Sequence, residues 1–90
     1  AIDVQEVASL AGLTVPAFSR YFRKMTQMTF TDFVNEFRIT QARKLLMTDR
    51  PIAAVADESG FNNLSHFNKV FRQRTGQTPG AYRRGLRMAS

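Results

Sequence analysis

Apolar residues recur at helical spacing in two short segments, near residues 18–25 and 67–71. At about 100° of rotation per residue, the apolar side chains of each segment fall on one face of a helix, and polar or basic side chains fall on the opposite face. The spacing predicts two amphipathic helices that pack their rings inward. Their apolar faces comprise Phe18, Tyr21, Phe22 and Met25 in the first segment, and Phe67, Val70 and Phe71 in the second.

These helices lie in the two copies of a degenerate tandem repeat. The first copy matches the second at an offset of 48 residues up to a shared glycine, and at an offset of 49 after it. Because the copies share their apolar and turn residues, each predicts the same local structure. The matches are Val7, Ala8, Gly12, Phe18, Phe22, Arg23, Thr26 and Thr29 with Val55, Ala56, Gly60, Phe67, Phe71, Arg72, Thr75 and Thr78.

Each copy has the features of two short helices joined by a tight turn. In the first copy, Asp3 and Glu6 have the spacing of a capping box, and Gly12 favours the left-handed conformation that ends a helix. Thr14 can cap the helix that follows. This arrangement is typical of a helix-turn-helix. An ordinary helical hairpin is the alternative, but two copies in one chain argue against a chance likeness.

The segment between the copies, "TFTDFVNEFRITQARKLLMTD", predicts one long helix. Thr29 and Asp32 form a start signal, and no residue breaks the helix before Asp49 and Pro51. Two apolar stripes run along it, so the helix could pack against both copies. The first stripe is Phe30, Phe33, Val34, Phe37 and Leu45, and the second is Ile39, Ala42 and Leu46.

Together these elements predict an all-α protein with two helix-turn-helix subdomains joined by a long central linker helix. We expect the first subdomain over residues 3–29, the linker helix over 30–48, and the second subdomain with a C-terminal helix over 51–87. A helix from Thr31 to Thr48 would measure about 27 Å at about 1.5 Å per residue. One turn of DNA is about 34 Å, so such a helix could hold two recognition helices in successive major grooves. An ordinary bundle helix would show the same stripes.

The positive charge is unevenly distributed along the 90 residues, whose formal net charge is +6. Residues 1–61 balance seven basic against seven acidic groups, whereas residues 62–90 carry six basic groups and no acid. A second window without acids, Val7 to Thr31, holds Arg20, Arg23 and Lys24. Two separate basic patches favour a long polyanion that is contacted twice.

Composition argues against several other function classes. The chain has no cysteine and one histidine, so neither a disulfide framework nor a zinc or haem site is expected, and we expect no cofactor. No nucleophile and base stand together, so no catalytic residue is assigned and an enzyme is not expected. No apolar run reaches the roughly 18 residues of a membrane span. A cytoplasmic protein is expected, with no membrane partner.

The faces opposite the rings carry donors suited to phosphates and base edges in the major groove of double-stranded DNA. Aromatic and basic residues could instead form a stacking platform for single strands, but stacking needs exposed rings and these rings face the core. A basic helical module that recruits an acidic protein partner remains the alternative.

The stretches "PIAAVADESGFNNLSHFNKVFRQRTGQTPGAYRR" and "FVNEFRITQARKLLMTD" resemble the DNA-binding domain of AraC/XylS-type transcription regulators. The resemblance covers nearly the whole chain. It implies two helix-turn-helix modules in one polypeptide that read adjacent major-groove segments of bacterial, nucleoid DNA. It also implies RNA polymerase as a partner, and an N-terminal helix and an effector or dimerisation domain that this chain lacks.

The resemblance also implies which residues face DNA. Three positions depart from the family, which usually has glycine at Gln27, an acid at Asn63 and an aromatic residue at His66. Two threonines that start helices would contact phosphates, and the other residues would face the groove. The candidate DNA-binding residues are Pro16, Ser19, Arg20, Arg23 and Thr29 in the first module, and Asn63, Leu64, Ser65, Asn68, Lys69, Arg72 and Thr78 in the second.

Overall fold

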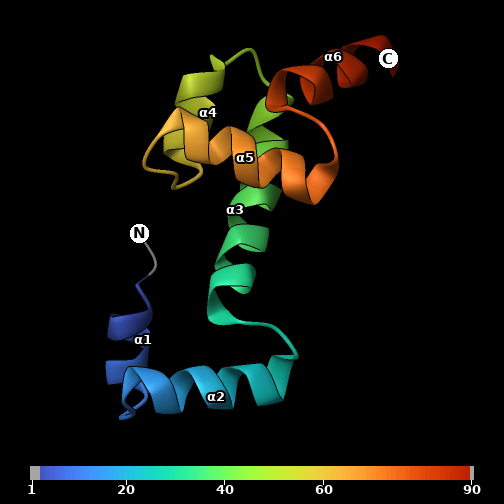
Figure 1. Ribbon diagram of the computed structural model, residues 1–90. Helices are drawn as coiled ribbons and strands as arrows, with labels where there is room; N and C mark the ends of the chain where they lie inside the picture. Colours follow the sequence, from blue (N-terminus) through green and yellow to red (C-terminus); the bar gives the residue numbers. More distant parts are fainter. Residues whose placement is uncertain (1–2, 90) are drawn as a thin grey trace. The chain divides into compact units, whose positions relative to one another are not determined.

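A computed structural model describes residues 3–89 of the chain, and these residues form six helices and no strand (Figure 1). The all-α prediction is therefore confirmed. The chain divides between Asn35 and Glu36 into two compact units, here unit 1 and unit 2, and α3 contributes residues to both. The helices are α1 (Val4–Leu10), α2 (Val15–Thr26), α3 (Phe30–Leu46), α4 (Ile52–Glu58), α5 (Leu64–Thr75) and α6 (Pro79–Ala89).

The helices of unit 1 begin and end where the local signals predict. Asp3 caps α1 by accepting a hydrogen bond from the Gln5 backbone N–H at 2.9 Å. Gly12 follows α1 with φ of 72°, a left-handed conformation that costs glycine little. Thr14 Oγ1 then accepts from the Ala17 N–H at 3.3 Å and caps α2. These local bonds explain why the first helix pair forms at these residues.

Unit 1 has a small core built around four aromatic rings. Phe18 and Val34 are buried, together with Ala8 from α1. The rings of Phe18, Phe22, Phe30 and Phe33 contact one another, with centroids 5.4 to 5.8 Å apart. Phe33 stays 42% exposed, so the cluster is open on one side. The prediction was wrong for Tyr21 and Met25, which are 57% and 64% exposed because no element within residues 3–89 covers that part of the α2 face. We infer that α2 is held mainly by ring contacts rather than by a deep core.

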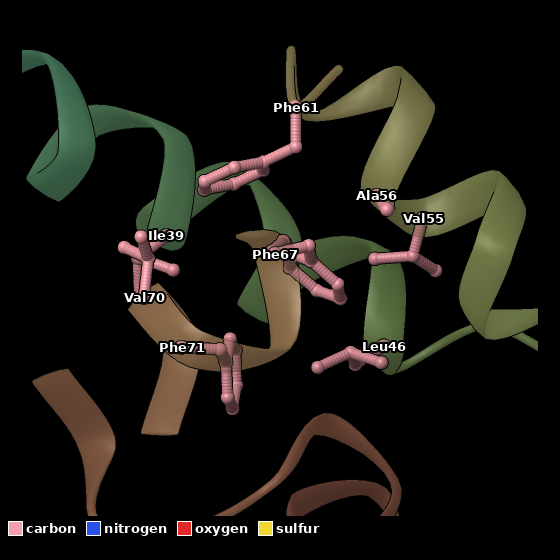
Figure 2. Packing of buried hydrophobic residues seen from close by; sticks show 9 residues of the cluster. Ile39, Leu46, Val55, Ala56, Phe61, Phe67, Val70 and Phe71 are labelled. Carbon is pink, nitrogen blue, oxygen red and sulfur yellow. The ribbon is translucent and has the colours of Figure 1, made fainter. Parts of the chain in front are cut away.

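Unit 2 has the larger core, in which α3, α4 and α5 meet (Figure 2). Phe67 lies among the labelled side chains, and its ring is 5.1 Å from Phe61 and 5.6 Å from Phe71 between centroids. Tyr82 of α6 extends this row, 5.4 Å from Phe71. The stripe predicted on the second half of α3 is confirmed here. The buried cluster is Ile39, Ala42, Leu46, Val55, Ala56, Phe61, Phe67, Val70 and Phe71.

The other predicted stripe of α3 is only partly buried, and the prediction was wrong for Phe37. Its side chain is 50% exposed. Phe37 precedes the buried Ile39 by two residues, so it lies about 200° round the helix, on the side of α3 that faces away from the core of unit 2. Periodicity identified an apolar position but could not show whether anything covers it.

Candidate nucleic-acid interface

Helices α2 and α5 share one register, which makes their faces comparable residue by residue. Both helices have 12 residues. The N-cap side chains of Thr14 and Asn63 each accept a backbone N–H three positions later, at 3.3 and 2.7 Å. Gln27 and Gly76 end the helices in the left-handed conformation. A residue of α2 therefore matches the residue 49 positions later in α5, as the repeat predicts.

The turns that follow the two helices are also built alike. The hydroxyl of Thr26 donates to the Phe22 carbonyl at 2.8 Å and accepts from the Met28 N–H at 3.2 Å. Thr75 makes the same pair of bonds, at 2.8 and 3.2 Å, in unit 2. These bonds place Thr29 and Thr78 at the starts of α3 and α6.

Thr29 and Thr78 serve as N-caps. Each hydroxyl oxygen accepts a backbone N–H of the following helix, from Asp32 at 3.0 Å and from Ala81 at 3.2 Å. Within residues 3–89 neither hydroxyl donates a hydrogen bond, so each cap can also donate to a phosphate. First-turn N–H groups of α3 and α6 lie beside them and favour negative charge.

In unit 1, most of the predicted residues gather around one hollow. Pro16, Ser19, Arg20 and Arg23 are exposed on α2. A hollow of about 390 Å³ is lined by the last three of these and by Thr29 at the start of α3. Two guanidinium groups thus stand beside a helix start. The hollow is completed by Val4, Phe30 and Thr31.

In unit 2, all six predicted residues of the α5 region are exposed. Asn63 has a structural task that the sequence interpretation did not assign, because its side-chain oxygen caps α5. Its preference for helix N-caps was the available signal. Leu64 is 43% exposed at the first position of the helix. The others are Ser65, Asn68, Lys69 and Arg72.

The cations on these two faces differ from several others in the chain. Within residues 3–89, the side chains of Arg20, Arg23, Lys69 and Arg72 make no hydrogen bond or ion pair. Neither α2 nor α5 contains an acidic residue. Other arginines of unit 2 form ion pairs, namely Arg50 with Glu58, Arg74 of α5 with Glu36 at 2.7 Å, and Arg87 with Asp49 at 3.1 Å.

Arg38 supports the turn before α5, a contact that the sequence interpretation missed. Its guanidinium carbon lies 5.8 Å from the centroid of the Phe61 ring. A side chain at Gly60 would place its Cβ 3.2 Å from Arg38 Nε, and Gly60 has φ of 91°. The positive φ therefore favours glycine at this turn, and a Cβ there would press against the Arg38 side chain. His66 stands edge-on to the same Phe61 ring, 5.7 Å away, and stays exposed.

Two further observations concern metal ions and membranes. Among residues 3–89, no three His, Asp or Glu side chains come together in a way that could hold a metal ion. None of the helices in that range combines the length and the hydrophobicity that crossing a bilayer requires.

Comparison with known proteins points to one class. The model of a family described as "Helix-turn-helix domain" matches residues 7–85. The regulatory protein PocR of Salmonella typhimurium is 42% identical over 86 residues, which cover 94% of this chain. The arabinose operon regulatory protein of Escherichia coli is 34% identical over 84 residues, 92% of this chain. The chain spans only 28% and 29% of the length of these two relatives.

A similar solved structure contains DNA. It is the DNA-binding domain of AdpA, a global transcriptional factor, in complex with a target DNA. The likeness has a TM-score of 0.92 at 30% sequence identity, and covers 99% of this chain and 81% of the AdpA chain.

Proposed function

Because this chain belongs to the AraC/XylS family of helix-turn-helix transcription regulators, we propose that it binds double-stranded DNA by presenting the outward faces of α2 and α5 to the major groove. It is an AraC-type DNA-binding domain, and its relative AdpA holds a target DNA through such a domain. The same membership supports a DNA-binding rather than a catalytic role.

One observation carries the proposal for these two faces. Helices α2 and α5 share one register and contain no acid, and Arg20, Arg23, Lys69 and Arg72 on them form no ion pair within residues 3–89. Phosphates and guanine edges are the partners that such cations would take from DNA. Arg20 and Lys69, which match in the repeat, would reach base edges. Arg23 and Arg72 lie nearly one turn later in each helix and would contact bases or phosphates.

Phosphate contacts would position the two helices. The N-cap hydroxyls of Thr29 and Thr78, with the first N–H groups of α3 and α6, are suited to hold phosphates beside the groove. In unit 1 the hollow between α2 and the start of α3 adds Arg20 and Arg23 to such a site. Contacts of this kind fix register and orientation but carry no sequence information.

The tandem repeat predicts what kind of DNA sequence the protein would recognise. Two helix-turn-helix copies follow each other in one chain direction, so a monomer would read a non-palindromic site with two informative blocks about 10 base pairs apart. A dimer of single modules would read a palindrome instead.

The remaining parts of the proposal concern the whole regulator. We propose RNA polymerase as a second partner, and an effector or dimerisation domain elsewhere in the protein. We also propose a cytoplasmic location with nucleoid association when DNA is bound. Membership of a family of transcription regulators supports these statements.

Selection from a random duplex library tests the proposed DNA recognition. The purified chain should enrich a non-palindromic site with two blocks. Its affinity for that site should fall steeply as the salt concentration rises, because binding of the protein releases counterions from the DNA phosphates. Scrambled duplexes should bind far more weakly. Equal affinity for selected and scrambled DNA, together with tight binding of an acidic protein, would instead favour the basic protein-interaction module.

A further inference from the structure

The shared register of α2 and α5 shows where the two proposed reading faces differ. Basic residues are kept at two matched positions, Arg20 with Lys69 and Arg23 with Arg72. Ser19 of α2 is replaced by Asn68 in α5. The cations at these matched positions favour the same partners, guanine edges and phosphates. The replacement of a hydroxyl by an amide changes which base can be recognised.

Asn68 is placed to meet a ligand rather than the protein. It follows Phe67, so it lies about 100° from that buried ring on the helix. It is exposed, and its amide makes no hydrogen bond within residues 3–89. Arg72, the candidate cation one turn later, lies on the same side of α5. A free amide thus stands beside two cations, Lys69 and Arg72, on a face without acids.

The chemistry of an amide selects one base. In the major groove, adenine presents the N7 acceptor beside the N6 amino donor, and a carboxamide can pair with both at once. A serine hydroxyl can pair with several bases and discriminates poorly. Among the other candidate residues of α5, Ser65 in place of Pro16 adds only such a hydroxyl, and Leu64 in place of Val15 adds an apolar side chain. Asn68 is therefore the change with a defined partner.

We infer that Asn68 specifies an adenine in the block of DNA read by α5, whereas Ser19 leaves the matching base pair in the block read by α2 unspecified. Two units of one fold would thereby recognise two different half-sites. The inference rests on the proposed function, since it requires α5 to lie in the major groove.

The test compares four chains in selection from a random duplex library: the wild type, Asn68→Ser, Ser19→Asn and the control Gln73→Ser. Gln73 is also an exposed amide on α5, but it lies about 140° from Asn68 around the helix. Wild type and Gln73→Ser should both select an adenine at one position of one block. Asn68→Ser should lose the preference at that position alone, and Ser19→Asn should create an adenine preference in the other block.

Titration of the selected site then tests the proposed hydrogen bonds. Changing that adenine to another base should weaken wild-type binding by about 5- to 150-fold. Replacing it with 7-deazaadenine, which lacks the N7 acceptor, should cost about fivefold. Neither change should much affect Asn68→Ser.

Failure of the inference can be told from failure of the proposed function. If the wild type selects two blocks and Asn68→Ser selects the same adenine, the inference is overturned while DNA recognition stands. An equal loss for both chains on 7-deazaadenine would overturn it as well. If the wild type selects no sequence at all, the proposed function fails and the inference fails with it.

Discussion

Gln27 and Gly76 adopt the same left-handed backbone conformation, with φ of 62° and 80°, at the residues that end α2 and α5. Each donates its backbone N–H to the carbonyl four residues earlier, at 2.8 and 2.9 Å. Gln27 is the one non-glycine residue with positive φ among residues 3–89. Its side-chain amide lies 3.4 Å from the Lys24 carbonyl, which offsets part of the backbone cost. The repeat thus imposes one turn geometry on two different residues.

The strain at Gln27 predicts that Gln27→Gly stabilises the chain. Left-handed geometry costs a residue with a Cβ about 1 to 2 kcal/mol, and glycine avoids this cost. Glycine also makes the unfolded chain more flexible, which lowers the free energy of unfolding and offsets part of the stabilisation. We expect the free energy of unfolding to rise by about 0.5 to 1 kcal/mol in urea denaturation. The reverse change in the other copy, Gly76→Gln, should lower it by a similar amount. Unfolding midpoints that did not move in opposite directions would contradict this explanation.

Ser59 predicts a second stabilising change. It is 5% exposed in the turn after α4, and its hydroxyl oxygen has no hydrogen-bond partner among residues 3–89. A buried polar group without a partner costs about 1 to 3 kcal/mol. Ser59→Ala should therefore raise the free energy of unfolding by about 1 kcal/mol. The matching residue of the first copy, Ala11, already lacks the hydroxyl.

Calorimetry of Ser59→Ala, with a variant of an exposed serine as the control, measures the change in the free energy of unfolding. Ser9→Ala changes a solvent-facing helical residue and should shift stability by less than about 0.5 kcal/mol. If Ser59→Ala lowered the melting temperature, the Ser59 hydroxyl of the wild type would have to form a hydrogen bond in solution.

Burial on α3 predicts opposite outcomes for two neighbouring apolar residues. Ile39 is 1% exposed in the core of unit 2, so Ile39→Ala should cost about 2 to 5 kcal/mol of stability. Phe37 is half exposed, and Phe37→Ala should cost only about 1 kcal/mol. Urea denaturation of the two variants provides the comparison. An equally large loss for Phe37→Ala would show that its ring is covered in solution.

Two arginines separate base reading from general charge. Arg20 lies on the outward face of α2 and forms no ion pair within the part of the chain that the structure describes. Arg20→Ala should weaken binding to the selected site by about 1 to 3 kcal/mol, with a smaller loss on scrambled DNA. Arg87 is held by Asp49 in unit 2. Arg87→Ala should weaken binding to both duplexes equally and only slightly.

These losses are measured by titrating Arg20→Ala and Arg87→Ala with the selected and the scrambled duplex at two salt concentrations. The loss for Arg20→Ala on the selected site should persist at high salt better than a purely ionic contact would. Equal losses on selected and scrambled duplexes would reduce Arg20 to a phosphate contact. Specificity would then rest on other residues or on DNA shape.

Much of the fold could be predicted from the sequence because its determinants are local. Helix caps, glycine turns and apolar faces depend on residues within four positions of each other, and both copies of the repeat contain them. The ring rows around Phe18 and Phe67 followed from periodicity alone. The exposed faces of α2 and α5 followed as well, because a helix that buries one side leaves the other to solvent.

Only the tertiary structure decided which charged side chains form ion pairs and which aromatic rings are covered. Glu36 with Arg74 and Asp49 with Arg87 are pairs 38 positions apart, so no local pattern distinguishes them from unpaired cations such as Lys69. The contact of Arg38 with Phe61 and the exposure of Phe37 are likewise set by how α3 packs against the rest of unit 2. Periodicity shows which side of a helix is apolar, but burial and pairing depend on what the folded chain brings to that side.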